Sequence, residues 1–250
     1  MSGGLAAGAV VIVGATSGVG RALAAGLARE GRPLVLAGRD PAEVEATAAD
    51  LRLRAGGPVA TVRLEALDHA GHAAAVEACF AGGRVAAVVL CIGHLGDHAA
   101  ALADAEEAHR LLETNFTASV LLAERFAEGL RAAGGGVLCA LSSVAGDRGR
   151  ASNYLYGAAK AGLTVHLEGL RHRLAGSGVR VVTVKLGMVD TRMSYGRPGS
   201  RLAFAPAAAA RGIRRALAGG PDTVYLPRFW RWIMLGIRSI PGPLFRRLPL

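Results

Sequence analysis

Short apolar runs rich in β-branched residues alternate along the chain with longer stretches rich in alanine and leucine. The short runs have the length of buried strands, and the longer stretches have the periodicity of helices. The predicted strands are 9–13, 33–37, 59–64, 85–92, 136–141, 179–186 and, as a short seventh, 223–226. The predicted crossover helices are 18–30, 41–54, 69–81, 104–133 and 152–175. This alternation predicts βαβ units and a doubly wound parallel sheet, with ligands at the carboxyl ends of the strands.

The 250 residues suffice for one large α/β domain, and no repeat or linker divides the chain. We therefore predict a single Rossmann-type domain over 1–250, with helices on both faces of the sheet in three α/β/α layers. Segment 188–205 carries glycine, proline, serine and arginine, and it is predicted to be a loop that covers the site as a substrate lid. Segment 227–250 is an apolar and basic C-terminal tail.

Composition narrows the class of protein. With 52% hydrophobic and 19% charged residues, the chain is predicted to pack a core. The net charge of +10 derives almost wholly from arginine, because Lys160 and Lys185 are the only lysines. We expect solvated arginines and no nucleic-acid partner, because no basic module interleaved with aromatic residues is present. Cys79, Cys91 and Cys139 lack the spacing of a disulfide framework or a metal site, and there is no signal peptide or membrane-spanning run, which predicts a cytoplasmic protein without a metal.

A glycine-rich turn with the spacing G-x-x-x-G-x-G follows the first predicted strand. Its candidate cofactor-binding residues are Gly14, Thr16, Ser17, Gly18, Val19 and Gly20. Glycines there allow backbone conformations and close approaches that a Cβ would block, so a pyrophosphate can sit at the N-terminus of the next helix. The turn predicts a dinucleotide site, and the alternative is an ordinary tight turn.

The second predicted strand is followed by Gly38, Arg39 and Asp40. In dinucleotide-binding folds an acidic residue at this strand end bonds the ribose 2′-hydroxyl, whereas an arginine accommodates a 2′-phosphate. Because Gly38 stands where the acid would stand, Arg39 favours NADP(H) over NAD(H). In the alternative interpretation, Arg39 and Asp40 only cap the next helix.

Tyr156 and Lys160 are spaced i, i+4 in a predicted helix, and Ser143 ends the fifth strand. This spacing places the phenol and the ammonium on one face, where a nearby cation is expected to lower the pKa of the tyrosine toward the working pH. That is the requirement of general acid/base catalysis. An isolated Y-x-x-x-K pattern more often marks a solvated helix face, but here it follows a glycine turn and a strand-end serine.

Together with Asn115, these motifs resemble the classical short-chain dehydrogenases/reductases over nearly the whole chain. The resemblance implies a nicotinamide-dependent oxidoreductase in which Tyr156 is the general acid/base. It further implies that Ser143 hydrogen-bonds the substrate carbonyl and that Lys160 lowers the tyrosine pKa and holds the nicotinamide ribose. Asn115 would support a water molecule in the proton relay.

The resemblance also implies cofactor contacts outside the glycine turn. Asp68, which we place at the end of the third strand, would contact the adenine, Thr191 would meet the nicotinamide carboxamide, and Gly93 would lie beside the cofactor. Two positions depart from the family pattern: Cys91 replaces the asparagine of Asn-Ala-Gly, and Leu186 replaces the proline of Pro-Gly. Neither position carries proton chemistry.

Segments 93–97, 190–194 and 227–250 resemble the branch of this family that reduces decaprenylphosphoryl-2-keto-ribose. This closer resemblance implies a substrate that is a ketone on a sugar or lipid-linked sugar. That branch is associated with NADH, whereas Arg39 favours NADPH. Two alternatives stay open, a generic reductase of a small hydrophobic ketone or alcohol and a non-catalytic dinucleotide-binding sensor. Sugar selection needs polar groups in the lid, which are Arg192, Ser194, Tyr195 and Arg197.

Partners follow from the resemblance and from the tail. The family implies a homo-oligomer, a dimer or tetramer, formed through the helices around 104–133 and 152–175. The tail combines aromatic residues with arginines and has no acidic residue, which is typical of a segment that lies peripherally at the inner face of a membrane. Pro241 and Pro243 break any helix that could span. Two alternatives to membrane contact are equally open: the tail could complete the substrate pocket, or it could pack against a neighbouring subunit.

Overall fold

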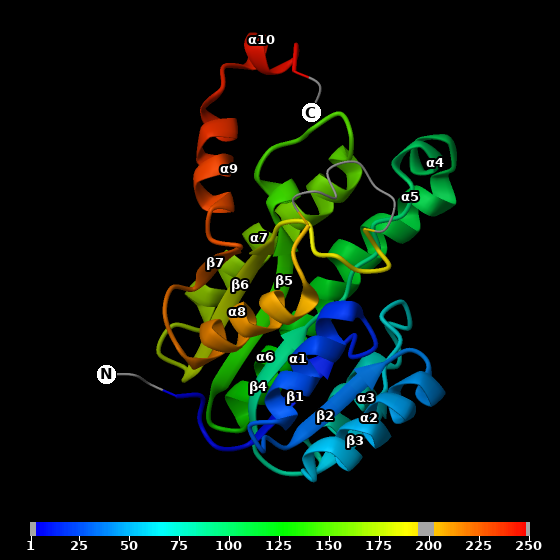
Figure 1. Ribbon diagram of the computed structural model, residues 1–250, viewed down its shortest axis with the longest axis vertical. Helices are drawn as coiled ribbons and strands as arrows, with labels where there is room; N and C mark the ends of the chain where they lie inside the picture. The colour runs from blue at the N-terminus through cyan, green and yellow to red at the C-terminus, as the bar shows by residue number, and fades with distance from the viewer. Residues whose placement is uncertain (1–3, 195–202, 249–250) are drawn as a thin grey trace.

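The computed structural model describes residues 4–194 and 203–248 (Figure 1). Within these residues, seven strands form one sheet in the order β3-β2-β1-β4-β5-β6-β7, and every neighbouring pair is parallel. The strands are β1 Ala9–Val13, β2 Leu34–Gly38, β3 Val59–Arg63, β4 Val85–Leu90, β5 Gly136–Ser143, β6 Val179–Leu186 and β7 Thr223–Leu226. The predicted doubly wound parallel sheet is therefore confirmed.

Helices cover both faces of the sheet, so the molecule has three layers (Figure 1). The helices that cover the two faces are α1 Gly18–Ala28, α2 Pro41–Ala55, α3 His72–Phe80, α6 Ala118–Ala132, α7 Tyr154–Arg173 and α8 Pro206–Ala218. Helices α1, α2 and α8 pack on one face, and α3, α6 and α7 pack on the other. Along β1, Val10 and Ile12 belong to the first core, and Val11 and Val13 belong to the second. Burial on both faces explains why the strands are continuous apolar runs.

The predicted helix 104–133 is wrong as a single element. The chain there forms α5 Ala105–Leu112, a π-helical turn at Glu113–Thr117, and then α6. Such turns insert one extra residue into a helix and often occur at functional sites. A short helix, α4 His98–Ala103, precedes α5 and was not predicted, nor was α8, which begins with Pro206 at its first position.

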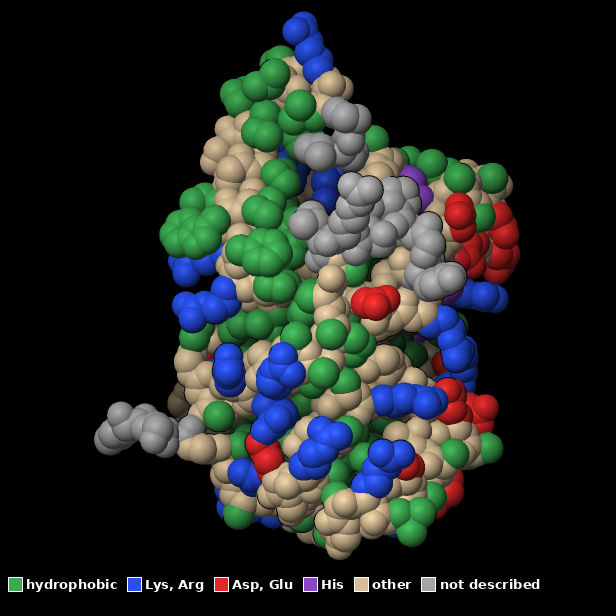
Figure 2. Space-filling view, viewed as in Figure 1, with side chains coloured by type: hydrophobic (Ala, Val, Ile, Leu, Met, Phe, Trp, Pro, Cys, Tyr) green, Lys and Arg blue, Asp and Glu red, His purple; other side chains and the backbone are tan. Residues whose placement is uncertain are grey.

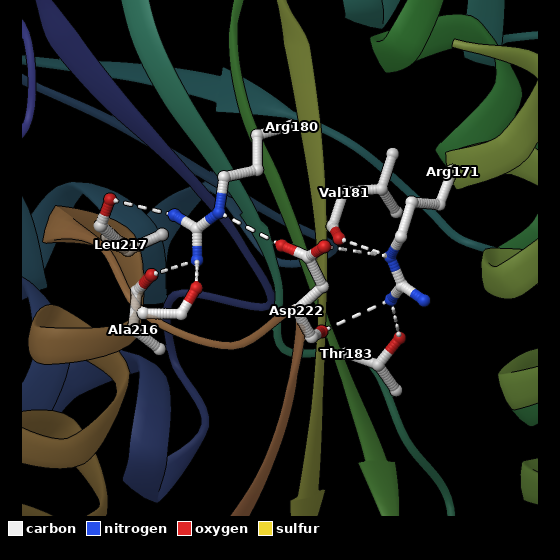
Figure 3. A network of polar contacts seen from close by, with 8 residues as sticks. Arg171, Arg180, Val181, Thr183, Ala216, Leu217 and Asp222 are labelled. Atoms are coloured by element: carbon white, nitrogen blue, oxygen red, sulfur yellow. Dashed lines mark hydrogen bonds and ion pairs between the residues drawn. The ribbon is translucent and has the colours of Figure 1, made fainter. Parts of the chain in front are cut away.

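Arg171 and Arg180 lie partly buried at the last strands and are not solvated on helix surfaces as expected (Figure 3). Arg171 of α7 donates to the carbonyl of Val181 at 3.0 Å and to that of Asp222 at 3.1 Å. Arg180 of β6 donates to the carboxylate of Asp222 at 3.1 Å and to the carbonyl of Ala216 at 2.9 Å. These two arginine side chains thus link α7, β6, α8 and the turn before β7 through hydrogen bonds and ion pairs.

Most of the predicted lid lies outside the described residues, including Tyr195 and Arg197. Its two ends meet beyond β6, because Val189 and Phe204 form an isolated parallel bridge. The tail forms α9 Trp230–Ser239 and α10 Gly242–Phe245, which project from the body (Figure 1). In the part of the chain that the structure describes, no helix has the length and apolar character needed to cross a membrane.

Candidate active site

Ser143, Tyr156 and Lys160 meet at the carboxyl end of the sheet, as the sequence predicts. Ser143 is the last residue of β5, and the other two occupy the first two turns of α7. The Ser143 Oγ accepts a hydrogen bond from the N–H of Ala145 at 3.1 Å, which caps the 3-10 turn Val144–Asp147. Helix α7 packs closely on this turn, because a Cβ added to Gly157 would lie 2.8 Å from the carbonyl oxygen of Ala145.

Burial dominates the ionisation of this group. It raises the pKa of Tyr156 to about 12, against a smaller opposite effect of the hydrogen bond with Ser143. Burial also lowers the pKa of Lys160 to about 8. The expected lowering of the tyrosine pKa is therefore wrong for this arrangement, because the ammonium lies 5.9 Å from the ring centroid and donates instead to the carbonyl of Leu141 at 3.1 Å. At neutral pH the phenol is protonated, which suits a proton donor.

Asn115 lies in the π-helical turn and is fully buried. Its Oδ1 accepts from the N–H of His94 at 3.1 Å, and its Nδ2 donates to the carbonyl of Leu111 at 2.8 Å. The same Nδ2 also donates to the carbonyl of His94. Asn115 therefore fixes the loop after β4, where a Cβ on Gly93 would lie 3.8 Å from Lys160 Nζ. The structure brings Asn115, Gly93 and Lys160 together, while the water-supporting role of Asn115 stays a prediction.

His94 was not predicted as part of the site. Its Nε2 lies 2.8 Å from the carboxylate of Glu107 on α5, and its backbone is bonded to Asn115 on both sides. This pair joins α5 to the loop beside Lys160. The only feature of the sequence that could have indicated this role is the position of the histidine directly after Gly93.

The glycine turn fits a dinucleotide pyrophosphate. Gly14 has φ of +77°, and a Cβ there would lie 2.7 Å from the carbonyl oxygen of Cys91. The side chain of Ser17 caps α1 by accepting from the N–H of Gly20 at 3.0 Å. A Cβ on Gly18 would lie 2.8 Å from Thr191 Cγ2. Thr191, which is predicted to contact the nicotinamide carboxamide, therefore lies against the glycine turn that is predicted to bind the pyrophosphate. The cradle depends on small residues, which leave the N-terminus of α1 open to an anion.

Around this turn, Thr16 and Val19 hold the cradle in place. The carbonyl of Thr16 accepts from Arg21 Nε at 2.9 Å, and Val19 is buried in the core.

The end of β2 carries Arg39 as predicted. Its side chain is 83% exposed, and its Nε lies 3.9 Å from a carboxylate oxygen of Glu65. Asp40 caps α2 by accepting from the N–H of Ala42 at 2.9 Å, whereas no cap bond from Arg39 is found among the described residues. Gly38 is required by packing, because a Cβ there would lie 2.8 Å from Val44 Cγ2. Arg39 is thus available to a 2′-phosphate.

Asp68 does not end the third strand. Strand β3 ends at Arg63, and Asp68 lies five residues later, where its carboxylate accepts from the N–H of Gly71 at 3.1 Å before α3. Glu65 is the acidic residue that follows the strand closely, two positions beyond Arg63. The adenine contact of Asp68 stays a prediction, with Glu65 as the nearer carboxylate.

The start of the tail packs against segments that follow the ends of β5 and β6. Trp230 is buried at the start of α9 and packs with Val144 and Met234. A Cβ on Gly187, directly after β6, would overlap the indole ring of Trp230. The indole Nε1 is buried and has no hydrogen-bond partner in the described residues. Trp230 therefore lies against the two segments that follow Ser143 and Leu186.

Polar contacts hold the segment after Ser143 in place. The buried carboxylate of Asp147 accepts from Lys185 Nζ at 2.5 Å and from the hydroxyl of Tyr225 at 2.8 Å, which joins the turn to β6 and β7. Arg148 donates to the carbonyl of Ile237 at 2.5 Å, near the end of α9. The serine segment is thus bonded both to the sheet and to the tail.

Comparisons with known proteins agree with this geometry. The family model for short chain dehydrogenases matches residues 8–198. An uncharacterised oxidoreductase of Mycobacterium tuberculosis is 38% identical over 241 residues, which are 96% of each chain. A short-chain dehydrogenase from Sphingobium yanoikuyae in complex with NADPH is similar with a TM-score of 0.77 and 28% identity, over 94% of this chain and 96% of that one. A short chain dehydrogenase from Burkholderia cenocepacia in complex with NADP has a TM-score of 0.82 at 24% identity, over 99% of both chains.

Proposed function

The chain belongs to the short-chain dehydrogenase/reductase family, and we propose that it is an NADP(H)-dependent reductase of a ketone with Tyr156 as proton donor. Family membership makes it an NAD(P)-dependent oxidoreductase, so we do not pursue the alternative of a non-catalytic dinucleotide-binding sensor. The observation that carries the proposal is the meeting of Ser143, Tyr156 and Lys160 at the strand ends, where Ser143 and Lys160 are buried and Tyr156 is partly exposed.

A bound nicotinamide dinucleotide supplies the hydride. Tyr156, whose raised pKa keeps the phenol protonated at neutral pH, gives its proton to the carbonyl oxygen as that oxygen gains charge. The hydroxyl of Ser143 donates a second hydrogen bond to the same oxygen. Lys160 supplies a positive charge beside the phenol and is placed to hold the ribose. Asn115 keeps the loop after β4 in the position that this arrangement needs.

The preference for NADP(H) rests on Arg39. Its exposed guanidinium at the end of β2 can form charge-assisted bonds with a 2′-phosphate, and its weak contact with Glu65 is easily exchanged. The relative from Sphingobium yanoikuyae is also described with NADPH.

The substrate we propose is a ketone on a sugar or on a lipid-linked sugar, as in the branch that reduces decaprenylphosphoryl-2-keto-ribose. Arg192 at the described end of the lid supplies an exposed polar group, whereas the hydroxyl of Ser194 is bonded to the backbone of the lid itself. Trp230 supplies an apolar wall for a hydrophobic carrier. The same wall favours a second candidate, a small hydrophobic ketone or alcohol.

We further propose a cytoplasmic homo-oligomer, a dimer or tetramer, assembled through α5, α6 and α7. The large apolar side chains exposed on these helices and on the π-helical turn are Leu112, Phe116, Leu121, Tyr154 and Val165. Exposed apolar groups on neighbouring helices are typical of a subunit interface.

The test is a paired assay of NADH and NADPH oxidation against lipid-phosphate keto-sugars and small ketones. The proposal expects turnover with NADPH that is lost in Tyr156→Phe, and faster turnover with the keto-sugars than with simple ketones. Turnover of small ketones alone would select the second candidate. Absence of turnover with every ketone, in a protein that binds NADPH, would contradict the reductase assignment.

A further inference from the structure

The C-terminal arm, residues 227–248, extends beyond the sheet as α9 and α10 (Figure 1). Only one side of α9 is buried: Trp230 and Met234 pack on Val144, and Ile237 is partly buried beside them. These three positions are spaced i, i+4 and i+7, so they share one face of the helix. The remaining faces of α9 are exposed in the described structure.

The exposed side of the arm is apolar to an unusual degree. Its large exposed side chains are Phe229, Trp232, Ile233, Leu235, Leu244 and Leu248. Trp232 alone is 68% exposed, although tryptophan is among the most buried residue types on average. Figure 2 shows hydrophobic side chains gathered over the projecting α9 and α10. An exposed apolar patch of this kind marks a contact surface.

The charge on the arm has one sign. Segment 227–250 has five arginines and no acidic residue, and all five are exposed. These residues are Arg228, Arg231, Arg238, Arg246 and Arg247. Arg231 and Arg238 are seven residues apart and therefore lie on one flank of α9. Arg246 and Arg247 follow α10 at the far end of the arm.

We propose that the arm is a docking surface for an anionic phospholipid bilayer. Aromatic and aliphatic side chains would enter the headgroup boundary, while the arginines meet lipid phosphates. A second copy of the chain fits less well, because a twofold contact between two arms would oppose arginines with no acidic partner. The arm lies on the surface and does not cross it, since α9 has ten residues.

The arm also connects this surface to the catalytic group. Arg148, five residues after Ser143, donates to the carbonyl of Ile237 at 2.5 Å and to that of Ile240 at 2.7 Å. Its guanidinium lies 3.7 Å from the centroid of the Phe245 ring, so it contacts both α9 and α10. A docked arm would therefore hold the mouth of the site beside the bilayer, whichever ketone the enzyme reduces.

The experiment measures binding of the full-length protein to vesicles of phosphatidylcholine with and without phosphatidylserine, by sedimentation at low salt. The proposal expects binding that requires phosphatidylserine and is lost in high salt, because exposed charges are screened. Each arginine near an anionic surface contributes about fivefold in affinity, so Arg246→Glu with Arg247→Glu should weaken binding by at least about thirtyfold. The control is Arg211→Glu with Arg215→Glu on α8, which changes the net charge by the same amount. Its affinity for the vesicles should fall much less than that of the arm variant.

Tryptophan emission gives a second readout. Trp230 and Trp232 are the only tryptophans in the chain, and Trp230 is already buried. Vesicles should therefore shift the emission of the wild-type protein to shorter wavelength, and Trp232→Phe should abolish that shift while binding persists. Because Trp232 is exposed, this variant is expected to fold.

Three results would overturn the proposal. One is equal binding to vesicles with and without phosphatidylserine. Another is equal loss of binding in the arm and α8 variants, which would reflect the net charge of +10 alone. The last is a dimer in sedimentation velocity that Trp232→Ala dissociates, which would assign the patch to a second copy. None of these measurements involves turnover, so they are independent of the proposed reaction.

Discussion

Gly187 and Trp230 provide a test of whether the C-terminal arm is part of the catalytic core. The perturbation is Gly187→Ala, because a Cβ at this position would overlap the indole ring of Trp230. Relief requires the indole to shift within the cluster that it forms with Val144 and Met234, and overpacking of a core costs about 1–3 kcal/mol. Trp230→Ala removes a buried aromatic ring and should cost about 3–5 kcal/mol in the free energy of unfolding.

The double variant distinguishes a direct contact from two separate defects. Once Trp230 is alanine, the new methyl group at position 187 enters the space that the indole leaves. The penalty of Gly187→Ala should then disappear, which gives a coupling of about 1–3 kcal/mol between the two changes. The assay is urea unfolding followed by circular dichroism at one protein concentration, because oligomers unfold in a concentration-dependent way.

A matched control is available on α9 itself. A Cβ on Gly236 would meet nothing within 4 Å, so Gly236→Ala should stabilise the helix by up to about 1 kcal/mol. If the effects of Gly187→Ala and Trp230→Ala add to within about 0.5 kcal/mol, the indole does not pack on the strand end as described. The same result would remove the arm from the wall of the site.

The remaining predictions concern the proton donor, the cofactor and the buried lysine. Tyr156→Phe should keep NADPH affinity but slow hydride transfer in stopped-flow by at least about a hundredfold, since it removes the proton donor and leaves the ring. Ser143→Ala should lower turnover more than NADPH affinity, and Lys160→Met should lower both. Calorimetry should show that the wild type binds NADPH ten- to hundredfold more tightly than NADH, because charge-assisted bonds to the 2′-phosphate contribute about 1.5–3 kcal/mol. Arg39→Ala should abolish this preference. Tighter binding of NADH by the wild type would contradict the prediction. Because burial lowers the pKa of Lys160 from 10.5 in the unfolded chain to about 8, the charged lysine opposes folding below about pH 8, and this penalty decreases as the pH rises from about 8 to 10. The stability advantage of Lys160→Met over wild type, measured by urea unfolding, should therefore shrink across that range by up to about 3 kcal/mol.

The sheet and the meeting of Ser143, Tyr156 and Lys160 could be predicted because both depend on local signals. Strands buried on both faces appear as uninterrupted apolar runs, and Val85–Leu90 is buried throughout. Tyr156 and Lys160 share a helix face by spacing alone, and Ser143 reaches them because parallel strands end at one edge. No long-range contact has to be known for these steps.

The break in the predicted helix 104–133 depends on such a contact. Asn115 bonds the backbone of His94, 21 residues away, and the π-helical turn lies where those bonds form. Helical periodicity continues through this segment, so the sequence gives no sign of the interruption. The pKa of Tyr156 was predicted in the wrong direction for a related reason: spacing shows that a cation is near but does not show that the phenol is buried.

In the arm, two residues of the same type on one helix differ in burial, which the composition of the segment does not show. Trp230 and Trp232 are two residues apart, and both were grouped with the apolar and basic tail. On α9 their side chains point to different faces, so Trp230 is buried against Gly187 while Trp232 is 68% exposed. The spacing of Trp230, Met234 and Ile237 predicts that one face is distinct, but it does not show which face packs on the body. Which face of α9 packs on the body depends on the space beside Gly187. Because glycine has no Cβ, that space is open to the indole ring of Trp230.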